Sequence, residues 1–96
     1  MHYLVVSVPQ ARDRRDELRE AEESALAEMI ADGFLVQIYR RHDGRGAYSI
    51  VEAPSEEEAR RRLDTLPFVR QQAISIEIIP VTARYGARAP VAESGR

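Results

Sequence analysis

Residues 18–51 constrain the fold more than any other stretch, because a helical pattern there passes directly into a strand–turn–strand pattern. Apolar residues recur at helical spacing from Leu18 to Ile30, and Gly33 then supplies the residue type that commonly follows a helix C-terminus. Two β-rich segments come next, FLVQIYR and AYSIVEA, around the Asp-Gly turn of RHDGRG. The stretch therefore predicts one amphipathic helix followed by a β-hairpin.

The flanking sequence adds a strand before this unit, and a helix and a strand after it. MHYLVVSV predicts a strand from about His2 to Val8, and Asp13 is a suitable N-cap for the first helix. Ser55 and Glu58 match a capping box at the start of a second helix, which the Leu-Pro pair of LDTLPF ends. AISIEIIPV, about residues 73–81, predicts the last strand.

The resulting β-α-β-β-α-β order is that of the ferredoxin-like fold. We expect an α+β sandwich in which a four-stranded antiparallel sheet carries both helices on one face. With 96 residues, the chain suits one compact domain, which we assign to residues 1–82. Residues 83–96 contain few large apolar side chains and are expected to form a C-terminal tail or an oligomer arm.

Glu22 breaks the amphipathic pattern of the first helix. At 100° per residue it falls about 40° from Leu18, inside the apolar stripe, whereas the other glutamates lie at its edge or on the far side. An ionised carboxylate under a helix is costly unless it is paired, and such a group often has a displaced pKa. Glu22 is therefore the first candidate for chemistry, and the alternative is a structural carboxylate paired with Arg40 or Arg19.

The register of the hairpin decides which residues face this helix. If Tyr39 pairs with Tyr48, the helix side carries Val36, Ile38, Arg40, Ala47, Ser49 and Val51. The opposite face then carries Leu35, Tyr39, Tyr48 and Ile50. A bulge would shift the pairing by one residue and reverse both faces. Because this opposite face is half apolar, we expect it to associate with the sheet of another copy.

Composition argues against several classes of function. The net charge is −2 with acidic and basic residues intermixed, so no basic face accumulates for nucleic acid. The absence of cysteine removes disulfides and thiolate chemistry, and two separated histidines, His2 and His42, argue against a zinc or haem site. No lysine is present for a Schiff base. Without an apolar run of about 20 residues or a targeting signal, we expect a cytoplasmic protein that is not bound to a membrane.

Read together, these residues resemble the muconolactone Δ-isomerase family over about residues 1–80. The helix LREAEESALAEMIADG, with Glu22 and Gly33, matches without a gap, and the next strand ends in an aromatic residue followed by an arginine, Tyr39-Arg40. AYSI, the Pro-Ser helix start and LDTLPF follow in the family's order. The resemblance implies a dimeric α/β barrel, as a homodimer or larger homo-oligomer. It also implies cofactor-free proton transfer on a small unsaturated lactone in aromatic compound catabolism.

This chemistry needs one base with a raised pKa in a dry pocket, and donors for an oxyanion. Glu22 is the candidate base, and Arg40 is the candidate for holding a substrate carboxylate or the developing enolate. Tyr39, Tyr48 and Ser49 are candidate hydroxyl donors, provided that their side chains reach the pocket. Neither a metal nor a cofactor is expected.

Three departures from the family keep other functions open. Ala47 stands where the family has an amide side chain, FVRQQA replaces its Pro-and-aromatic segment, and its His-Pro is absent from VTARYG. The loss of the amide at Ala47 and of the His-Pro favours a non-catalytic small-ligand-binding or assembly protein of the same fold. A cyclase or cofactor-free oxygenase acting on a polyketide-like aromatic would require a larger, aromatic-lined pocket. The fold is therefore more firmly predicted than the substrate.

Overall fold

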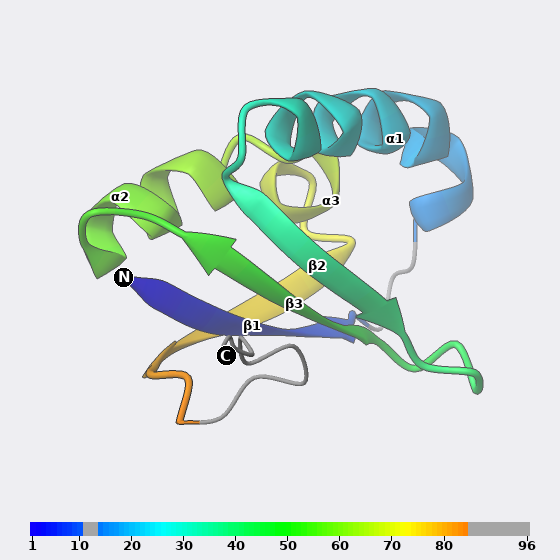
Figure 1. Cartoon of the computed structure of the whole chain (residues 1–96). Coiled ribbons are helices and arrows are strands. Elements are labelled where there is room, and N and C mark those ends of the chain that lie inside the picture. Colours follow the sequence, from blue (N-terminus) through cyan, green and yellow to red (C-terminus); the bar gives the residue numbers. More distant parts are fainter. Residues whose placement is uncertain (11–13, 85–96) are drawn as a thin grey trace.

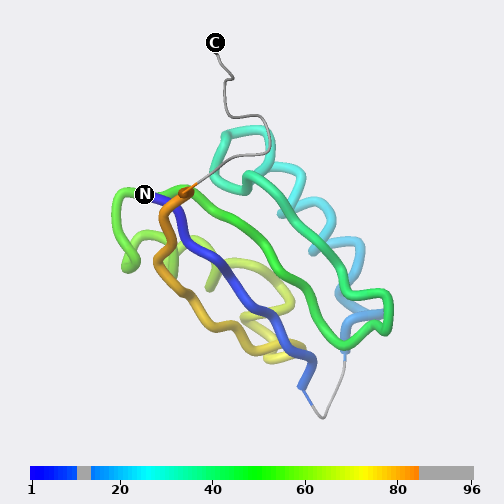
Figure 2. Tube along the Cα trace, turned by 60° about the horizontal axis from the view of Figure 1, so that its bottom comes forward, coloured from blue at the N-terminus to red at the C-terminus, as the bar shows by residue number. Residues whose placement is uncertain are grey.

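The computed structural model describes residues 1–10 and 14–84. Along this part of the chain the elements are β1 (His2–Pro9), α1 (Arg15–Ala31), β2 (Leu35–Arg40), β3 (Ala47–Glu52), α2 (Glu56–Leu63), α3 (Pro67–Arg70) and β4 (Ile74–Val81). The strands form one antiparallel sheet in the order β2-β3-β1-β4. Figure 1 shows the helices together on one face, and Figure 2 shows the strands from the uncovered side. The predicted ferredoxin-like α+β fold is confirmed.

β1 lies at the centre of the sheet because it pairs with β3 along one edge and with β4 along the other. Its residues alternate between faces, so Tyr3 and Val5 are buried against the helices. The core continues through Val51 of β3 and Leu63 of α2, both buried. This packing fixes the helix-facing side of the sheet, on which the candidate site is built.

The ends of the helices follow the sequence signals with one exception and one addition. Gly33 ends α1 with φ of 87°, a conformation that side chains rarely adopt, and its N–H donates to the Ile30 carbonyl at 3.2 Å. The hydroxyl of Ser55 caps α2 by accepting from the Glu58 N–H at 3.1 Å. The Leu-Pro pair does not itself end α2, because α2 ends at Leu63 and residues 64–66 follow it; the short helix α3, which the sequence did not predict, then begins at Pro67. The cap predicted for α1, Asp13, lies outside the described residues.

A bulge in β2 corrects the predicted faces of the hairpin. Tyr39 pairs with Tyr48 as predicted, but the register shifts between Leu35 and Gln37, so Val36 is an extra residue. Since one inserted residue reverses the alternation beyond it, Leu35 turns toward the helices and Val36 turns outward. Their exposed fractions, 5% and 51%, are the reverse of the prediction. The bulge thus places the side chain of Leu35 in the core.

The described chain ends three residues after β4. Residues 85–96, which make up most of the predicted tail or arm, lie outside the described residues. Among the described helices, none has the length and apolar character needed to cross a membrane.

Candidate active site

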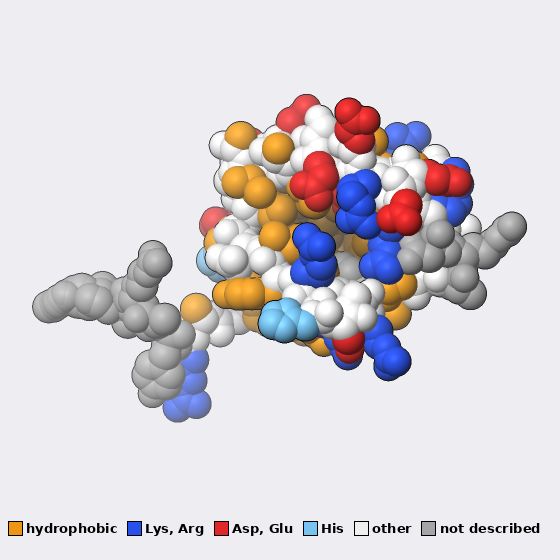
Figure 3. All heavy atoms as spheres, turned by 90° about the vertical axis from the view of Figure 1, so that its right-hand side faces the viewer, with side chains coloured by type: hydrophobic (Ala, Val, Ile, Leu, Met, Phe, Trp, Pro, Cys, Tyr) orange, Lys and Arg blue, Asp and Glu red, His pale blue; other side chains and the backbone are white. Residues whose placement is uncertain are grey.

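A cavity of about 520 Å³ lies between the helix-facing side of the sheet and helices α1 and α3. Its interior is apolar and includes Val5, Leu26, Leu63 and Ile76. Figure 3 looks onto the end of the molecule where α1 begins, and it shows apolar side chains at the bottom of a hollow rimmed by arginine and acidic side chains. The cavity is large enough for a single-ring ligand of the size that protein pockets usually hold.

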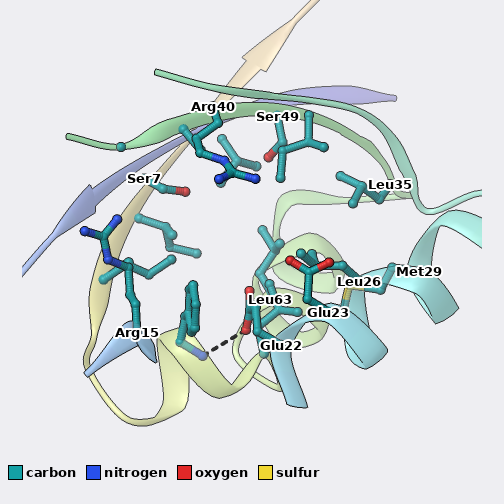
Figure 4. Close-up of a pocket in the computed structure, with 18 of the residues that line it drawn as sticks. Ser7, Arg15, Glu22, Glu23, Leu26, Met29, Leu35, Arg40, Ser49 and Leu63 are labelled. Atoms are coloured by element: carbon teal, nitrogen blue, oxygen red, sulfur yellow. Dashed lines mark hydrogen bonds between the residues drawn. The ribbon is translucent and has the colours of Figure 1, made fainter. Parts of the chain in front are cut away.

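Glu22 lies in the wall of this cavity that α1 provides. Its side chain is only 5% exposed, because the apolar face of α1 packs down around it. One carboxylate oxygen, Oε1, accepts a hydrogen bond of 3.0 Å from the Phe68 N–H, drawn as the dashed line in Figure 4. Pro67 begins α3 without an N–H, so Phe68 supplies the first backbone donor of that helix.

The electrostatic surroundings of Glu22 favour its protonated form. Burial is the largest cause, and it raises the pKa of Glu22 above the ordinary value; the negative charge of Glu23 acts in the same direction, and the Phe68 N–H opposes both. No ion pair of Glu22 is found among residues 1–10 and 14–84. Arg19, one of its two predicted partners, pairs instead with Asp16 at 3.3 Å. The alternative of a structural ion pair with Arg40 or Arg19 is therefore wrong.

The sheet wall of the cavity carries Arg40, Ser49, Ser7 and Ala47. Figure 4 shows the guanidinium of Arg40 and the hydroxyl groups on the sheet side, with Glu22 and Glu23 on the opposite, helical side. Arg40 has neither a hydrogen-bond nor an ion-pair partner within the described chain. Ser49 is 7% exposed. The cavity thus holds an acidic wall and a basic, hydroxyl-bearing wall with apolar side chains between them.

Tyr39 and Tyr48 do not reach this cavity. Each alternates with a residue that does line it, Arg40 on β2 and Ser49 on β3, so both point to the uncovered face of the sheet. Tyr39 is 62% exposed there. The condition for the two tyrosines to act as hydroxyl donors is not met in this cavity, and strand alternation is the reason. His42 is exposed in the turn between β2 and β3.

Within the described part of the chain, no group of three or more histidine, cysteine, aspartate or glutamate side chains is arranged to hold a metal ion.

The sequence and the fold are both similar to those of known proteins. The muconolactone delta-isomerase family matches residues 1–85, which is most of the chain. The chain belongs to the muconolactone delta-isomerase family. A search of curated proteins finds no significant match.

Two solved structures resemble this member of the muconolactone delta-isomerase family in fold. One is a muconolactone isomerase, with a TM-score of 0.66 and 21% identity over 93% of this chain and 97% of that chain. The other is 5-chloro-2-hydroxyhydroquinone dehydrochlorinase from Burkholderia phenoliruptrix AC1100 in complex with 2,5-dihydroxybenzoquinone. Its TM-score is 0.73, with 16% identity over 85% of this chain and 94% of that chain. At these identities the two likenesses establish the shared fold alone.

Sequence analysis missed several residues of the cavity. Glu23 lies at the edge of the helical stripe, a position that the periodicity alone reads as solvent-facing. Ser7 follows Tyr3 and Val5 at a spacing of two, so strand alternation already placed it on the helix-facing side. The contribution of Phe68 is a backbone N–H, for which no side-chain pattern exists.

Proposed function

We propose that this protein is a cofactor-free isomerase that moves a proton on a small unsaturated lactone or a related enolisable ring. The observation that carries the proposal is Glu22, a carboxylate 5% exposed with a raised pKa, facing a ring-sized cavity without an ion-pair partner in the described chain. Active-site acids and bases commonly have such perturbed environments. Membership of the muconolactone delta-isomerase family gives further support.

In the proposed reaction, ionised Glu22 removes a proton from the carbon next to the conjugated system. The electron pair of the broken C–H bond moves into the ring, and negative charge develops on the carbonyl oxygen. The proton on Glu22 exchanges with solvent, and Glu22 then returns a proton to another carbon of the dienolate, so the double bond shifts and the composition of the molecule is unchanged. In heavy water the returned proton is therefore a deuteron. One group acts as base and then as acid, which requires a pKa nearer to neutral than that of an exposed glutamate.

The remaining polar groups of the cavity support roles in stabilising the intermediate and in holding the substrate. The hydroxyl of Ser49 and the guanidinium of Arg40 lie on the wall opposite Glu22, where the hydroxyl would meet the oxygen that gains charge and the guanidinium would meet a carboxylate of the substrate. The apolar residues between the two walls exclude water, which strengthens both interactions. The Phe68 N–H fixes one carboxylate oxygen, which leaves the other oxygen for the proton.

We also propose that the protein works as a homodimer or larger homo-oligomer joined through the uncovered face of the sheet. This face carries the exposed Tyr39 and Tyr48, and its apolar character continues onto Val6 of β1. Sedimentation velocity should give at least a dimer for the wild type, and Tyr39→Asp should shift it toward monomer. Tyr39→Phe is the matched control and should keep the assembly. A monomeric wild type would contradict the proposal.

Deuterium incorporation into simple butenolides tests the proposed reaction, and the natural substrate need not be identified first. The butenolides are incubated with the wild type in heavy water, and exchange at the ring carbons is followed by NMR. Exchange should exceed the uncatalysed rate, and its pH dependence should report ionisation of one group with a raised pKa. If butenolides bind but none exchanges, the isomerase proposal is wrong and the protein is a ligand-binding member of the family.

A further inference from the structure

The pairing of the strands surrounds Ala47 with polar groups. On β3, Ala47 pairs with Arg40 of β2 on one side and with Ser7 of β1 on the other. Ser49 lies two residues along β3 and therefore on the same face. All four residues line the cavity, and we call them the Ala47 notch. The small side chain at its centre leaves room between the guanidinium and the two hydroxyl groups.

The polar groups of the Ala47 notch lack partners in the described chain. Neither the hydroxyl of Ser7, nor that of Ser49, nor the guanidinium of Arg40 forms a hydrogen bond with any residue in the ranges 1–10 and 14–84. Ser49 is more than nine-tenths buried, and buried hydroxyl groups normally have a partner. Figure 4 shows the labelled groups facing the cavity. A ligand in the cavity would satisfy them.

The position of Ser7 is fixed by the backbone beside it. Gly46, next to Ala47, adopts φ of 145°, and a Cβ at this position would collide with the carbonyl oxygen of Ser7. The chain that leads into β3 therefore packs directly on the end of β1. This close approach holds Ser7 across from Arg40 before any ligand arrives, which lowers the cost of ordering the site.

The depth of the residues indicates which part of a ligand each one meets. Arg40 is exposed and Ser7 half-buried, whereas Ser49 and Glu22 are buried. A fully charged group is costly to bury, so an ionised substituent would remain near the mouth, and the reacting ring carbon would lie deeper, at Glu22. A carboxylate is planar and accepts from two sides, which suits a guanidinium and a hydroxyl on either side of a methyl group.

We propose that Ser7 is a substrate-binding residue, and that its hydroxyl and the Arg40 guanidinium hold one carboxylate of the ligand over the methyl group of Ala47. The inference rests on the proposed function, and it adds Ser7 and Ala47 to the residues that determine which ligand fits the site. Ser49 is then left to face the ring itself. The size of residue 47 sets whether the carboxylate fits.

The test uses two butenolides with the same ring, one of which bears a carboxylate side group. Deuterium exchange is measured for the wild type, Ser7→Ala and Ala47→Val, with Ser75→Ala on the uncovered face of the sheet as the matched control. Ser7→Ala should raise the KM for the carboxylate-bearing compound about tenfold, with kcat near the wild-type value. Ala47→Val should raise it at least as much, because the added methyl groups fill the notch. Neither variant should change the KM for the unsubstituted ring.

Other results of this experiment would overturn the Ser7 proposal or separate it from the isomerase proposal. Equal KM values for Ser7→Ala, Ala47→Val and Ser75→Ala would overturn the proposal, and so would equal losses on both compounds. If the wild type exchanges neither compound, the isomerase proposal fails, and titration calorimetry with the carboxylate-bearing butenolide tests the notch alone. Weaker binding to Ser7→Ala and Ala47→Val than to Ser75→Ala would support it. Equal binding, or no binding to the wild type, would overturn it.

Discussion

Two acid–arginine couples in this molecule use the same residue types in opposite ways. At the end of α1, Asp32 accepts a hydrogen bond of 2.8 Å from Arg62, whose guanidinium also lies 4.4 Å from the centre of the Phe34 ring. In the cavity, Glu22 and Arg40 face each other from opposite walls without forming an ion pair. The first couple fastens α1 to α2, and the second leaves a carboxylate and a guanidinium available to a ligand.

The pKa values of the two acids shift in opposite directions, because Asp32 has a cation in contact and Glu22 does not. The hydrogen bond from Arg62 is the main cause that lowers the pKa of Asp32, and the Phe34 N–H adds to it. Desolvation is the main cause that raises the pKa of Glu22, and no cation of the described chain compensates for it. A carboxylate with a cation at contact distance remains charged and inert, whereas one buried without a cation can accept and return a proton.

Replacing each acid by its amide should separate the two couples most clearly. Glu22→Gln keeps the shape of the side chain but removes the base, so the rate of deuterium exchange should fall by about 10²- to 10⁴-fold. Asp32→Asn should leave the exchange rate unchanged, because Asp32 does not line the cavity. NMR-detected exchange on both variants, with circular dichroism to confirm folding, makes the comparison. An equal loss in the two variants would mean that Glu22 has no special role.

Replacing each arginine should give the second largest difference. Arg40→Gln removes a charged hydrogen-bond donor that is unpaired in the described chain, so the KM for a carboxylate-bearing butenolide should rise about 10- to 100-fold. Arg62→Gln should leave that KM unchanged, since Arg62 is engaged with Asp32. Steady-state kinetics of the two variants checks this. If Arg62→Gln proves as harmful as Arg40→Gln, the anion site is not in the cavity.

The pH dependence of stability should differ in sign between the two acids. A raised folded-state pKa means that the wild type loses stability as pH rises from the ordinary glutamate value to that of Glu22, by about 1.4 kcal/mol per unit of the shift. Glu22→Gln removes this loss, so the variant should gain stability relative to the wild type as pH rises across that window. The lowered pKa of Asp32 stabilises the fold above the ordinary aspartate value, and this contribution is lost as pH falls through the folded-state pKa.

Asp32→Asn should therefore be less stable than the wild type at neutral pH, and this deficit should shrink in acid. Because Asp32 and Arg62 are exposed, this is the smallest of the expected effects. Urea unfolding between pH 3 and 8 compares both variants with the wild type. The quantity compared is the free energy of unfolding of each variant minus that of the wild type. If this difference rises with pH for both Glu22→Gln and Asp32→Asn, or falls for both, the assignment of the two environments is contradicted.

The sequence was sufficient to predict the fold and half of the site, because both depend on local periodicity. The alternation of MHYLVVSV, the stop at Gly33 and the Asp-Gly turn determine the order of the elements without reference to distant contacts. Glu22 was found because it interrupts a regular apolar stripe. Arg40 and Ser49 followed from the Tyr39–Tyr48 pairing, which the structure confirms.

The other features of the fold and the site depend on contacts between segments that are distant in the sequence, which local patterns do not report. The bulge at Val36 has no glycine or proline to signal it, so strand alternation alone predicts the wrong face for Leu35. Nothing local connects Ser7 with Ala47, because their pairing is set by how β1 and β3 align. The hydrogen bond from the Phe68 N–H to Glu22 arises only when α3 packs against α1.

The most direct test of a buried, unpaired base is the titration of Glu22 itself. Carbon-detected NMR of the side-chain carboxyl groups follows Glu22 and Asp32 in the same wild-type sample, and Glu22→Gln identifies the signal. Glu22 should titrate above the ordinary glutamate range, while Asp32 titrates below the ordinary aspartate range. A Glu22 midpoint at or below the ordinary glutamate value would contradict the account, because the cavity would then hold an ordinary solvated carboxylate.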